Sequence, residues 1–457
     1  MKKKYFGILG LGISGAATVE FMIKKGYNFI VWDDSPESIK QCEKTLKISK
    51  KALNVCNPDD KAWTKIDYLI ASPGIPNLRD HKILKSFGKD TEIICDIELF
   101  YMHFPKQKYI AITGTNGKST TTKLIEHILT CNGQIAKVCG NIGTPILSLT
   151  PKKNEIIVLE ISSYQLDLIK TFRPNVAVIL NITPDHLERH GSMEKYIESK
   201  KRIFLNQTTD DYLILNTDDQ VLSKIYNFLL QKNQINLIPT SSEKNFFKGI
   251  SMLGNFIYDN IHKTKLHLPK NKNLRGKHNR ENIINSYATT SILTPLFKTR
   301  LHHAIKTYPG LIHRFQFLGV AQGIEFINDS KATNVEATKK ALNSLKDEED
   351  IFWIGGGLPK KDGLNLIKES LKTINYAFLI GKAQDEFARV LDEINVPYKA
   401  SNTLDAAFKD AMEVICMTKK GAKTLLLSPA CASFDQWKNF EKRGERFIQL
   451  VKEQIKQ

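Results

Sequence analysis

Short apolar runs alternate along the chain with longer stretches in which apolar residues recur every three or four positions. Runs of the first kind include YFGILG from Tyr5, NFIVWDD from Asn28 and KYIAITG from Lys108. Such runs are typical of buried strands, and the stretches between them are typical of amphipathic helices. Because this alternation continues over almost the whole length, we expect an α/β protein with mainly parallel sheets.

Two interruptions divide this pattern into three parts. The segment FYMHFPKQ (100–107) precedes a new strand, and the Pro309-Gly310 pair precedes another series of strands. We therefore expect a Rossmann-like domain over residues 1–96, a P-loop ATPase-like α/β domain over 97–310 and a Rossmann-like domain over 311–457. The weaker pattern between about 235 and 270 predicts a small antiparallel patch, and FQFLGV with IEFIND predicts a hairpin.

Composition adds little to this fold prediction. Apolar residues make up 42% of the chain and charged residues 25%, as in globular proteins. The net charge of +18 favours anionic partners, but the basic residues are scattered without aromatic interleaving, which is typical of solvated surfaces. We expect no nucleic-acid partner, and we expect a monomer.

The cellular setting follows from the cysteines and the chain's first residues. The seven cysteines form no CxxC pair, which indicates a reduced, cytoplasmic environment. The opening MKKKYFGILGLGISGAA resembles a secretory signal, yet its continuation into TVEFMIKKGYNFIVWDD predicts a strand–helix–strand unit. No apolar run approaches the roughly 20 residues that span a bilayer, so no membrane association is expected.

The most specific motif is TGTNGKSTTT (113–122), which lies between a predicted strand and an amphipathic helix. The common phosphate-binding loop has four residues between its first glycine and its Gly-Lys pair, whereas here only two separate Gly114 from Gly117. Such a turn points backbone N–H groups at an anion, and Lys118 adds positive charge. Ser119 or Thr120 can offer a hydroxyl to a magnesium ion. We interpret the motif as a shortened nucleotide site.

Acidic and histidine side chains follow the neighbouring strands. Glu160 ends the run IIVLE, and Asp185 and His186 follow VAVILN. Open α/β sheets bind ligands at the carboxyl ends of their strands, and magnesium prefers oxygen ligands. A solvated strand end and a structural histidine are the alternative interpretations.

A second glycine motif, GLGISG (Gly10, Gly12, Gly15), opens the chain, and Asp33 and Asp34 end the next strand 33 − 15 = 18 residues later. This is the dinucleotide fingerprint, although any pyrophosphate, including a UDP group, would select the same glycines. In the last third, Lys331, Lys360 and Ser433 would suit an acidic small molecule, or they belong to a solvated face.

The motifs occur together in the order seen in the Mur ligases, the ATP-dependent amide-forming enzymes of peptidoglycan synthesis. They are TGTNGKST, EISSYQL, NITPDHLERHG followed by YIESKKRIF, GKHNREN, HRF, NDSKATN and SPACASFDQWKNFEKRG. The last three resemble the D-glutamate-adding branch most closely. The resemblance implies a ligase that activates a UDP-N-acetylmuramoyl-L-alanine carboxylate as an acyl phosphate and couples it to D-glutamate.

The resemblance also implies roles for individual residues. The implied catalytic residues are Lys118, Glu160, His186 and Lys200, and the ligands of two magnesium ions are Ser119, Glu160, His186 and Lys200, with Lys200 carbamylated. The ATP-binding residues are Gly114, Thr115, Asn116, Gly117, Lys118, Ser119, Thr120, Asn279, His313, Arg314, Asp329 and Lys331. The UDP-substrate contacts are Gly12, Ser14, Asp33, Asp34, Ser72 and Asn141, and the D-glutamate contacts are Thr333, Lys360, Ser433 and Phe440.

Two register choices and three rival functions remain open. Tyr196 and Arg202 favour Lys200 over Lys201. Lys360 is preferred over Lys361 as the carboxylate partner, in a loop, GGGLPKKDG, that differs from the commoner spellings in the family. A folylpolyglutamate synthase would leave GLGISG unexplained, a NAD-dependent oxidoreductase would leave the Gly-Lys loop idle, and a nucleic-acid-binding ATPase rests on charge alone. Domain closure, with hinges near 97–107 and 308–312, is expected for the ligase.

Overall fold

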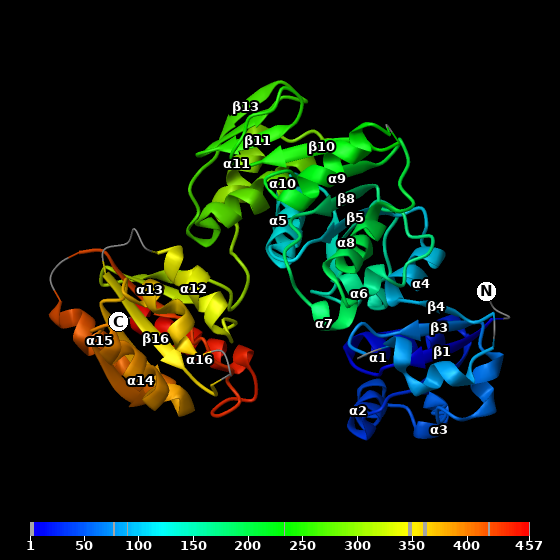
Figure 1. Ribbon diagram of the computed structural model, residues 1–457, viewed down its shortest axis with the longest axis horizontal. Coiled ribbons are helices and arrows are strands. Elements are labelled where there is room, and N and C mark those ends of the chain that lie inside the picture. The colour runs from blue at the N-terminus through cyan, green and yellow to red at the C-terminus, as the bar shows by residue number, and fades with distance from the viewer. Residues whose placement is uncertain are drawn as a thin grey trace. The chain divides into compact units, whose positions relative to one another are not determined.

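A computed structural model describes residues 4–75, 78–88, 90–232, 234–345, 350–359, 363–418 and 421–456. Its contacts divide the chain into two units, the first containing 1–269 and 277–306 and the second containing 270–276 and 307–457. Figure 1 shows the chain coloured from blue at the N-terminus to red at the C-terminus.

The first sheet of unit one is parallel and confirms the strand–helix–strand prediction for the N-terminal segment. Its strand order is β2-β1-β3-β4. The strands are β1 (Tyr5–Leu9), β2 (Asn28–Trp32), β3 (Tyr68–Ala71) and β4 (Glu92–Ile94), and the helices are α1 (Ile13–Lys25), α2 (Pro36–Leu46) and α3 (Lys50–Leu53). The glycine turn lies between β1 and α1, at the carboxyl end of the sheet.

The second sheet has the order β13-β12-β11-β10-β9-β8-β5-β7-β6. Its strands are β5 (Lys108–Thr113), β6 (Ala136–Gly140), β7 (Ile156–Glu160), β8 (Val176–Ile179), β9 (Tyr212–Asn216), β10 (Asn236–Ser241), β11 (Ile250–Leu253), β12 (Phe256–Asp259) and β13 (Thr264–His267). Strands β11, β12 and β13 pair antiparallel, which confirms the patch predicted there, and the pairs from β6 to β11 are parallel.

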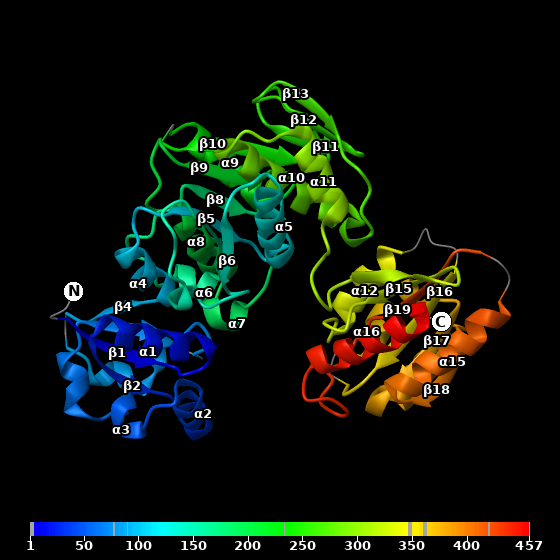
Figure 2. The same ribbon diagram turned by 180° about the vertical axis from the view of Figure 1, so that it is seen from behind.

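Helices α5, α9 and α10 pack against strands of this second sheet. The helices of this part of the chain are α4 (Asp96–His103), α5 (Lys118–Cys131), α6 (Ser163–Leu166), α7 (Leu187–His190), α8 (Met193–Lys201), α9 (Gln220–Leu230), α10 (Lys277–Leu293) and α11 (Lys298–Thr307). Helices α5 and α10 lie side by side in both views (Figures 1 and 2). The phosphate loop, which joins β5 to α5, is therefore held between the sheet and α10.

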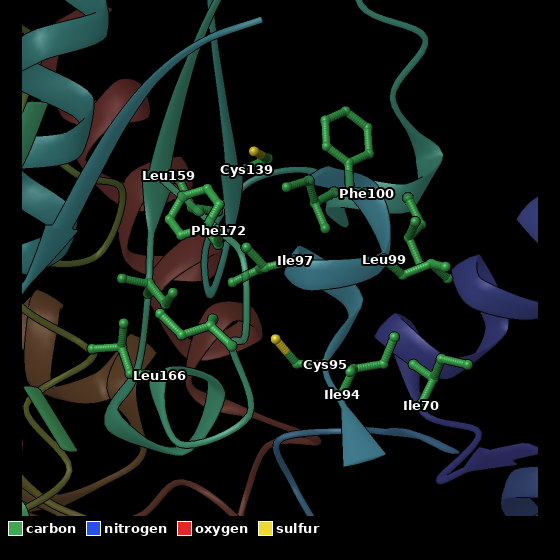
Figure 3. Packing of buried hydrophobic residues seen from close by; sticks show 14 of the residues in the cluster. Ile70, Ile94, Cys95, Ile97, Leu99, Phe100, Cys139, Leu159, Leu166 and Phe172 are labelled. Carbon is green, nitrogen blue, oxygen red and sulfur yellow. The ribbon is translucent and has the colours of Figure 1, made fainter. Parts of the chain in front are cut away.

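One continuous apolar core joins the two sheets of unit one. Ile70 and Ile94 of the first sheet belong to the same buried cluster as Leu159 of β7 and Phe172, with α4 between them (Figure 3). The segment expected to act as a hinge, 97–107, is mostly this helix, and its Leu99 side chain is fully buried. Burial of this kind favours a rigid joint over a hinge.

The sheet of unit two has the order β14-β15-β19-β16-β17-β18, and β14 with β15 forms the predicted hairpin. Its strands are β14 (Gln316–Ala321), β15 (Ile324–Asn328), β16 (Asp350–Gly356), β17 (Tyr376–Ile380), β18 (Tyr398–Asn402) and β19 (Lys423–Leu427). Its helices are α12 (Val335–Asn343), α13 (Lys368–Leu371), α14 (Gln384–Glu393), α15 (Leu404–Met417) and α16 (Phe440–Lys456).

Successive side chains of β16 point to opposite faces of this sheet, as strand geometry requires. Trp353 belongs to one core cluster, together with residues of α12, α13 and α14, whereas Phe352 belongs to another with residues of α15 and α16. The sheet is therefore covered by helices on both faces. Together with the two sheets of unit one, it gives the predicted three-domain α/β fold.

Two features bear on the expected setting. All seven cysteines are free. In the part of the chain that the structure describes, no helix combines the length and apolar character needed to cross a membrane.

Candidate functional site

The phosphate loop requires glycine at both ends. Gly114 has φ 152° and Gly117 has φ 83°, a backbone region that residues with a Cβ rarely adopt. A Cβ on Gly117 would also overlap Oδ1 of Asn282 on α10. Asn282 in turn accepts a hydrogen bond from Thr121 Oγ1 at 3.2 Å and donates one to Asn279 Oδ1 at 2.9 Å. These contacts bring the predicted nucleotide residue Asn279 next to α5.

Backbone groups after β8 hold the other side of the loop. The Thr115 amide donates to the Asn181 carbonyl at 3.0 Å, and the Asn116 amide donates to Asn181 Oδ1 at 2.8 Å. Thr115 Oγ1 accepts from the Thr183 amide at 3.0 Å and lies 3.1 Å from the Tyr196 hydroxyl. These contacts hold the loop in one conformation, and such order lowers the entropy lost on binding.

Lys118 begins α5 and lies across the loop. Its Nζ donates to the carbonyls of Gly114 at 2.8 Å and Thr115 at 2.9 Å. Ser119, the next residue, is buried at the start of the same helix. A positive charge and a helix N-terminus at one place form a binding site for phosphate groups.

Glu160 ends β7 and is almost completely buried, with 2% of its surface exposed. Its Oε1 accepts a hydrogen bond from Asn141 Nδ2 at 3.1 Å, and its carbonyl accepts from the Asn141 amide at 2.9 Å. Its Oε2 is buried and has no hydrogen-bond partner among the described residues. A buried carboxylate oxygen without a partner is unfavourable unless a cation binds it, so this atom fits a magnesium ligand.

Lys200 and Lys201 have different surroundings. Lys200 is 2% exposed, donates to the Gly114 carbonyl at 2.9 Å, and lies 4.7 Å from the centre of the Tyr196 ring. Burial, reinforced by the charge of Lys118 and opposed by Asp185, lowers the pKa of Lys200 to about 7. Lys201 instead pairs with Glu198 at 2.7 Å near the surface. The two lysines can therefore be tested against each other.

His186 has a left-handed backbone, with φ 53°, and its side chain is 48% exposed. Its Nε2 lies 3.5 Å from Asp185 Oδ2, and its ring centre lies 5.2 Å from that of Tyr164. Among the described residues, no group of three or more His, Cys, Asp or Glu side chains is arranged to hold a metal ion. A second ion would need the oxygens of a carbamylated Lys200, because an ammonium group repels a cation.

The turn after β1 is built by hydrogen bonds from its own neighbours. Asp33 accepts from the amides of Leu11 at 2.6 Å and Ser35 at 2.8 Å, so both carboxylate oxygens support the backbone. Ser72 Oγ donates to the Gly10 carbonyl at 2.9 Å. Gly12 and Ser14 lie at the start of α1, where N–H groups are available to an anion. Asp34 lies at the edge of the turn, with its Oδ2 2.8 Å from His81 Nε2.

In unit two, the residues predicted to contact ATP gather around His313. Its Nδ1 lies 3.0 Å from Asn328 Nδ2, and its carbonyl accepts from the Lys331 amide at 3.0 Å. Asp329 accepts from Ser428 Oγ at 2.9 Å and from the Phe315 amide at 3.0 Å. Burial raises the pKa of Asp329 to about 7, although these hydrogen bonds favour its ionised form. Arg314, between His313 and Phe315, is partly exposed.

The residues predicted to contact D-glutamate lie on two neighbouring loops and α16. Ser433 is buried, and its Oγ has no partner in the described part of the chain. Phe440 begins α16, with the centre of its ring 5.5 Å from Lys331 Nζ. Thr333 lies two residues after Lys331, and its amide donates a hydrogen bond to the Lys331 carbonyl at 2.8 Å. Lys360 lies outside the described residues.

Sequence reasoning did not find Arg443, which is 1% exposed. Its Nη2 donates to the carbonyls of Ser330 at 3.0 Å and Cys431 at 3.1 Å, and its Nη1 is buried with no partner among the described residues. Arg443 therefore links the loops that carry Asp329 and Ser433. An arginine in NFEKRG gives no sign of burial, although the following Gly444, whose Cβ would overlap His313, could have suggested close packing.

Asn181, Asn282 and His190 were also not predicted. The two asparagines stand in NITPDH and GKHNREN, within recognised motifs, so their place next to the phosphate loop could have been proposed from the resemblance. His190 is part of NITPDHLERHG, but no pattern in that motif indicates which of its two histidines is buried.

The comparisons with known proteins cover nearly the whole chain. Family models match in three places, the Mur ligase MurD-like N-terminal domain at residues 4–95, the Mur ligase middle domain at 112–290 and the Mur ligase glutamate ligase domain at 313–431. The UDP-N-acetylmuramoylalanine–D-glutamate ligase of Rickettsia prowazekii (strain Madrid E) is 42% identical over 453 residues, which are 99% of this chain and 98% of that protein. The ligase of the same name from Agrobacterium fabrum is 36% identical over 462 residues, with 98% and 95% covered.

Solved structures agree on the fold. The UDP-N-acetylmuramate–alanine ligase of Thermotoga maritima superposes with a TM-score of 0.59 at 17% identity, covering 98% of this chain and 99% of its own. The MurF ligase of Thermotoga maritima in complex with ADP has a TM-score of 0.55 at 17% identity, with 82% and 91% covered. Since the family models and relatives span all three domains, this chain belongs to the Mur ligase family.

Proposed function

We propose that this protein is an ATP-dependent ligase that joins D-glutamate to UDP-N-acetylmuramoyl-L-alanine, releasing ADP and phosphate, in cytoplasmic peptidoglycan precursor synthesis. The observation that carries the proposal is the hydrogen-bonded phosphate loop after β5, next to Glu160 at the end of the neighbouring strand β7. The buried Oε2 of Glu160 has no hydrogen-bond partner among the described residues. The name shared by relatives at 36–42% identity over nearly the full chain supports the choice of substrates.

The reaction needs activation, because a carboxylate has a poor leaving group. The γ-phosphoryl group of ATP is transferred to an oxygen of the L-alanine carboxylate, and this forms an acyl phosphate and ADP. The D-glutamate amine then attacks the acyl carbon, the C–O bond to phosphate breaks, and the amine proton is lost. The protein's contribution is positioning and charge neutralisation, with Lys118 and the loop amides on the transferring phosphate.

Magnesium is proposed as the cofactor, and when bound it would neutralise the converging phosphate and carboxylate oxygens. Ser119 and Glu160 would hold one ion, and His186 with carbamylated Lys200 would hold a second. The low pKa of Lys200 supports the carbamate, because the neutral amine is the form that reacts with carbon dioxide. The carbamate would present oxygens where the ammonium presents only donors.

The remaining contacts are distributed over the three domains. Asn279, His313, Arg314, Asp329 and Lys331 are proposed for ATP, and Thr333, Lys360, Ser433 and Phe440 for D-glutamate. Gly12, Ser14, Asp34, Ser72 and Asn141 are proposed for the UDP-substrate, with Asp33 acting through the backbone that it holds. The enzyme would act as a monomer whose second unit closes on bound nucleotide about residues 308–312.

One assay tests the assignment. Phosphate release is measured with ATP and UDP-N-acetylmuramoyl-L-alanine while D-glutamate, L-glutamate, L-lysine or DNA is added in turn. Stimulation by D-glutamate alone is the expected result. Stimulation by L-lysine without D-glutamate, or by DNA, would overturn the proposal.

A further inference from the structure

The antiparallel patch of the second sheet, β11 to β13, carries positive charge with almost no negative charge. These strands lie at one end of the sheet, with β13 at its edge (Figure 2). Residues 244–269 include Lys244, Lys248, Lys263 and Lys265, and Asp259 is the one acidic residue of this segment. All four lysines are exposed. The patch is therefore a place where the positive charge of the chain is concentrated at the surface.

Asp259 offsets little of this charge at the surface, because its side chain is fully buried. Its Oδ1 accepts hydrogen bonds from the amides of Ile261 at 3.0 Å and His262 at 2.9 Å. Its Oδ2 accepts one from the Tyr287 hydroxyl of α10 at 2.9 Å and lies 2.7 Å from His262 Nδ1. The carboxylate is directed into the protein, and the lysines determine the charge that a partner would meet.

A fully exposed aromatic ring belongs to the same patch. Phe247 lies in the loop between β10 and β11. Asn260, in the turn between β12 and β13, holds this loop. Its Nδ2 donates hydrogen bonds to the Phe246 carbonyl and, at 3.1 Å, to Asn245 Oδ1, and its amide donates to the Gly249 carbonyl at 3.0 Å. These bonds fix the loop against the turn while the Phe247 ring remains in water.

An open hollow lies where this loop meets the turn. Its lining includes the apolar side chains of Phe246, Phe247 and Ile261 together with Lys248 and Lys263. No acidic side chain is among the described residues that line it. Exposed apolar groups and ammonium groups therefore occur at one place, which is the composition of an interfacial membrane anchor.

We propose that this surface, the basic tip (Phe246, Phe247, Lys248, Ile261 and Lys263), docks on an anionic lipid membrane. The lysines attract negatively charged headgroups, and the apolar side chains enter the boundary between headgroups and acyl chains. From the sequence we expected no membrane association, because no apolar run is long enough to span a bilayer. Docking on the surface needs no spanning helix.

Other partners fit the basic tip less well. A second copy of this chain would bring the same positive charge to the contact and would be repelled. Single-stranded nucleic acid binds through successive aromatic rings on which bases stack, whereas Ile261 has no ring and Phe246 is half-buried. A lipid surface is fluid, so it can accept the Phe247 ring without a complementary pocket.

The basic tip lies apart from the phosphate loop. Strands β10, β9 and β8 separate β11 from β5, so these two strands are roughly 19 Å apart at the usual strand spacing. No residue of the basic tip has a role in the proposed function. The inference is therefore independent of that function, and the two can fail separately.

The test measures binding of the full chain, without substrates, to sedimented vesicles near 0.15 M salt. The native protein should bind vesicles that contain about 30% phosphatidylglycerol and should not bind pure phosphatidylcholine. Lys248→Ala/Lys263→Ala should weaken this binding at least about tenfold, because each lysine contributes to the attraction. Phe247→Ser leaves the charge unchanged and should weaken it at least about threefold, because the inserted ring is lost.

Two matched variants serve as controls. Lys44→Ala/Lys51→Ala removes two exposed lysines of the first sheet's domain, and Phe228→Ser removes an exposed ring on α9 whose centre lies 4.6 Å from Lys232 Nζ. Both should stay within about twofold of the native affinity. Phe247→Trp should shift its fluorescence emission to shorter wavelength with anionic vesicles, whereas Phe228→Trp should not, since only position 247 enters the membrane.

Three results would contradict the inference. The first is a native protein that does not bind anionic vesicles. The second is an equal loss of binding in the tip variants and in their controls, because the attraction would then belong to the overall charge. The third is tighter binding to a single-stranded oligonucleotide than to anionic vesicles, lost in Phe247→Ser, which would assign the basic tip to nucleic acid.

Discussion

The Lys200 Nζ donates a hydrogen bond to the Gly114 carbonyl at 2.9 Å, and Lys118 Nζ donates to the same oxygen at 2.8 Å. One peptide group of the phosphate loop therefore holds the amines of α5 and α8 together. Burial of Lys200 and the nearby charge of Lys118 both disfavour a second ammonium, which is why the pKa of Lys200 falls to about 7. In the proposed function, the loop that would bind phosphate thereby also favours the neutral Lys200 amine that carbamylation requires.

We expect Lys200 to carry the carbamate and Lys201 to remain unmodified. With a pKa near 7 about half of the Lys200 amines are neutral at pH 7, against roughly three in ten thousand for an ordinary lysine. Protein equilibrated with ¹³C-bicarbonate should show one carbamate resonance by NMR, absent in Lys200→Ala and retained in Lys201→Ala. A resonance that disappears in Lys201→Ala instead would show that the register of α8 has been misread.

Replacement of Glu160 by glutamine should show the effect of the carboxylate charge alone, because glutamine has nearly the same size and shape. Glu160→Gln keeps an oxygen for the Asn141 side-chain amide but removes the negative charge that the buried Oε2 would offer to a cation. We expect phosphate release to fall by at least about a hundredfold, since loss of one preorganised electrostatic contact has effects of that order. The melting temperature should remain the same or rise, because a buried charge is removed. Unchanged turnover would exclude Glu160 from the metal site.

The shape of the phosphate loop predicts a strict requirement for glycine at position 117. Gly117→Ala forces a Cβ into Asn282 Oδ1 at a positive φ, so the loop must distort. Binding of an ATP analogue, measured by calorimetry, should weaken at least tenfold. Gly12→Ala is the control, since a Cβ there meets nothing within 4 Å and the residue lies in the first sheet's domain. Equal nucleotide affinity in Gly117→Ala and native protein would contradict the loop geometry.

The pKa of Asp329 predicts a pH dependence of stability in unit two. Because this pKa is raised from 3.8 to about 7, the folded chain binds an extra proton between those values. The contribution of Asp329 to the free energy of unfolding is complete below about pH 4 and is lost as the pH rises through about 7. Its total is on the order of 4 kcal/mol. Asp329→Asn removes this titration. The melting temperature of the native protein minus that of Asp329→Asn should therefore fall as the pH rises from 4.5 to 7.5. A difference that stays constant over this range would contradict the raised pKa of Asp329.

Replacement of Arg443 should weaken the binding of D-glutamate, because Arg443 holds together the loops that carry Asp329 and Ser433. Arg443→Lys cannot reach the Ser330 and Cys431 carbonyls together in the same planar geometry, so the loop carrying Ser433 loses its support. We expect the KM for D-glutamate to rise at least tenfold in steady-state assays, whereas the KM for the UDP-substrate, whose proposed contacts lie in unit one, should stay within twofold. Arg446→Lys, at a surface pair with Asp405, is the control. Equal effects on both KM values would contradict this role.

Local patterns were sufficient for the fold and for the glycine loops. The strand before Gly114, the helix after Gly117 and the hairpin of β14 and β15 all follow from periodicity over a few residues. Burial was not predictable in this way, because Lys200 and Lys201 are identical in type and adjacent in sequence. Only the packing of α8 against the phosphate loop separates them, because it buries Lys200 over the Tyr196 ring of the same helix and leaves Lys201 near the surface. Arg443 and His190 were missed for the same reason, since each contacts residues that are distant in sequence.

The central claim is that ATP activates the L-alanine carboxylate before D-glutamate attacks it. It is tested most directly with UDP-N-acetylmuramoyl-L-alanine carrying ¹⁸O in both carboxylate oxygens, followed by mass spectrometry of the phosphate released on coupling. An acyl phosphate transfers one labelled oxygen to phosphate and leaves the other in the new amide. One ¹⁸O in each released phosphate is the result we predict, and unlabelled phosphate formed together with the amide product would contradict the account.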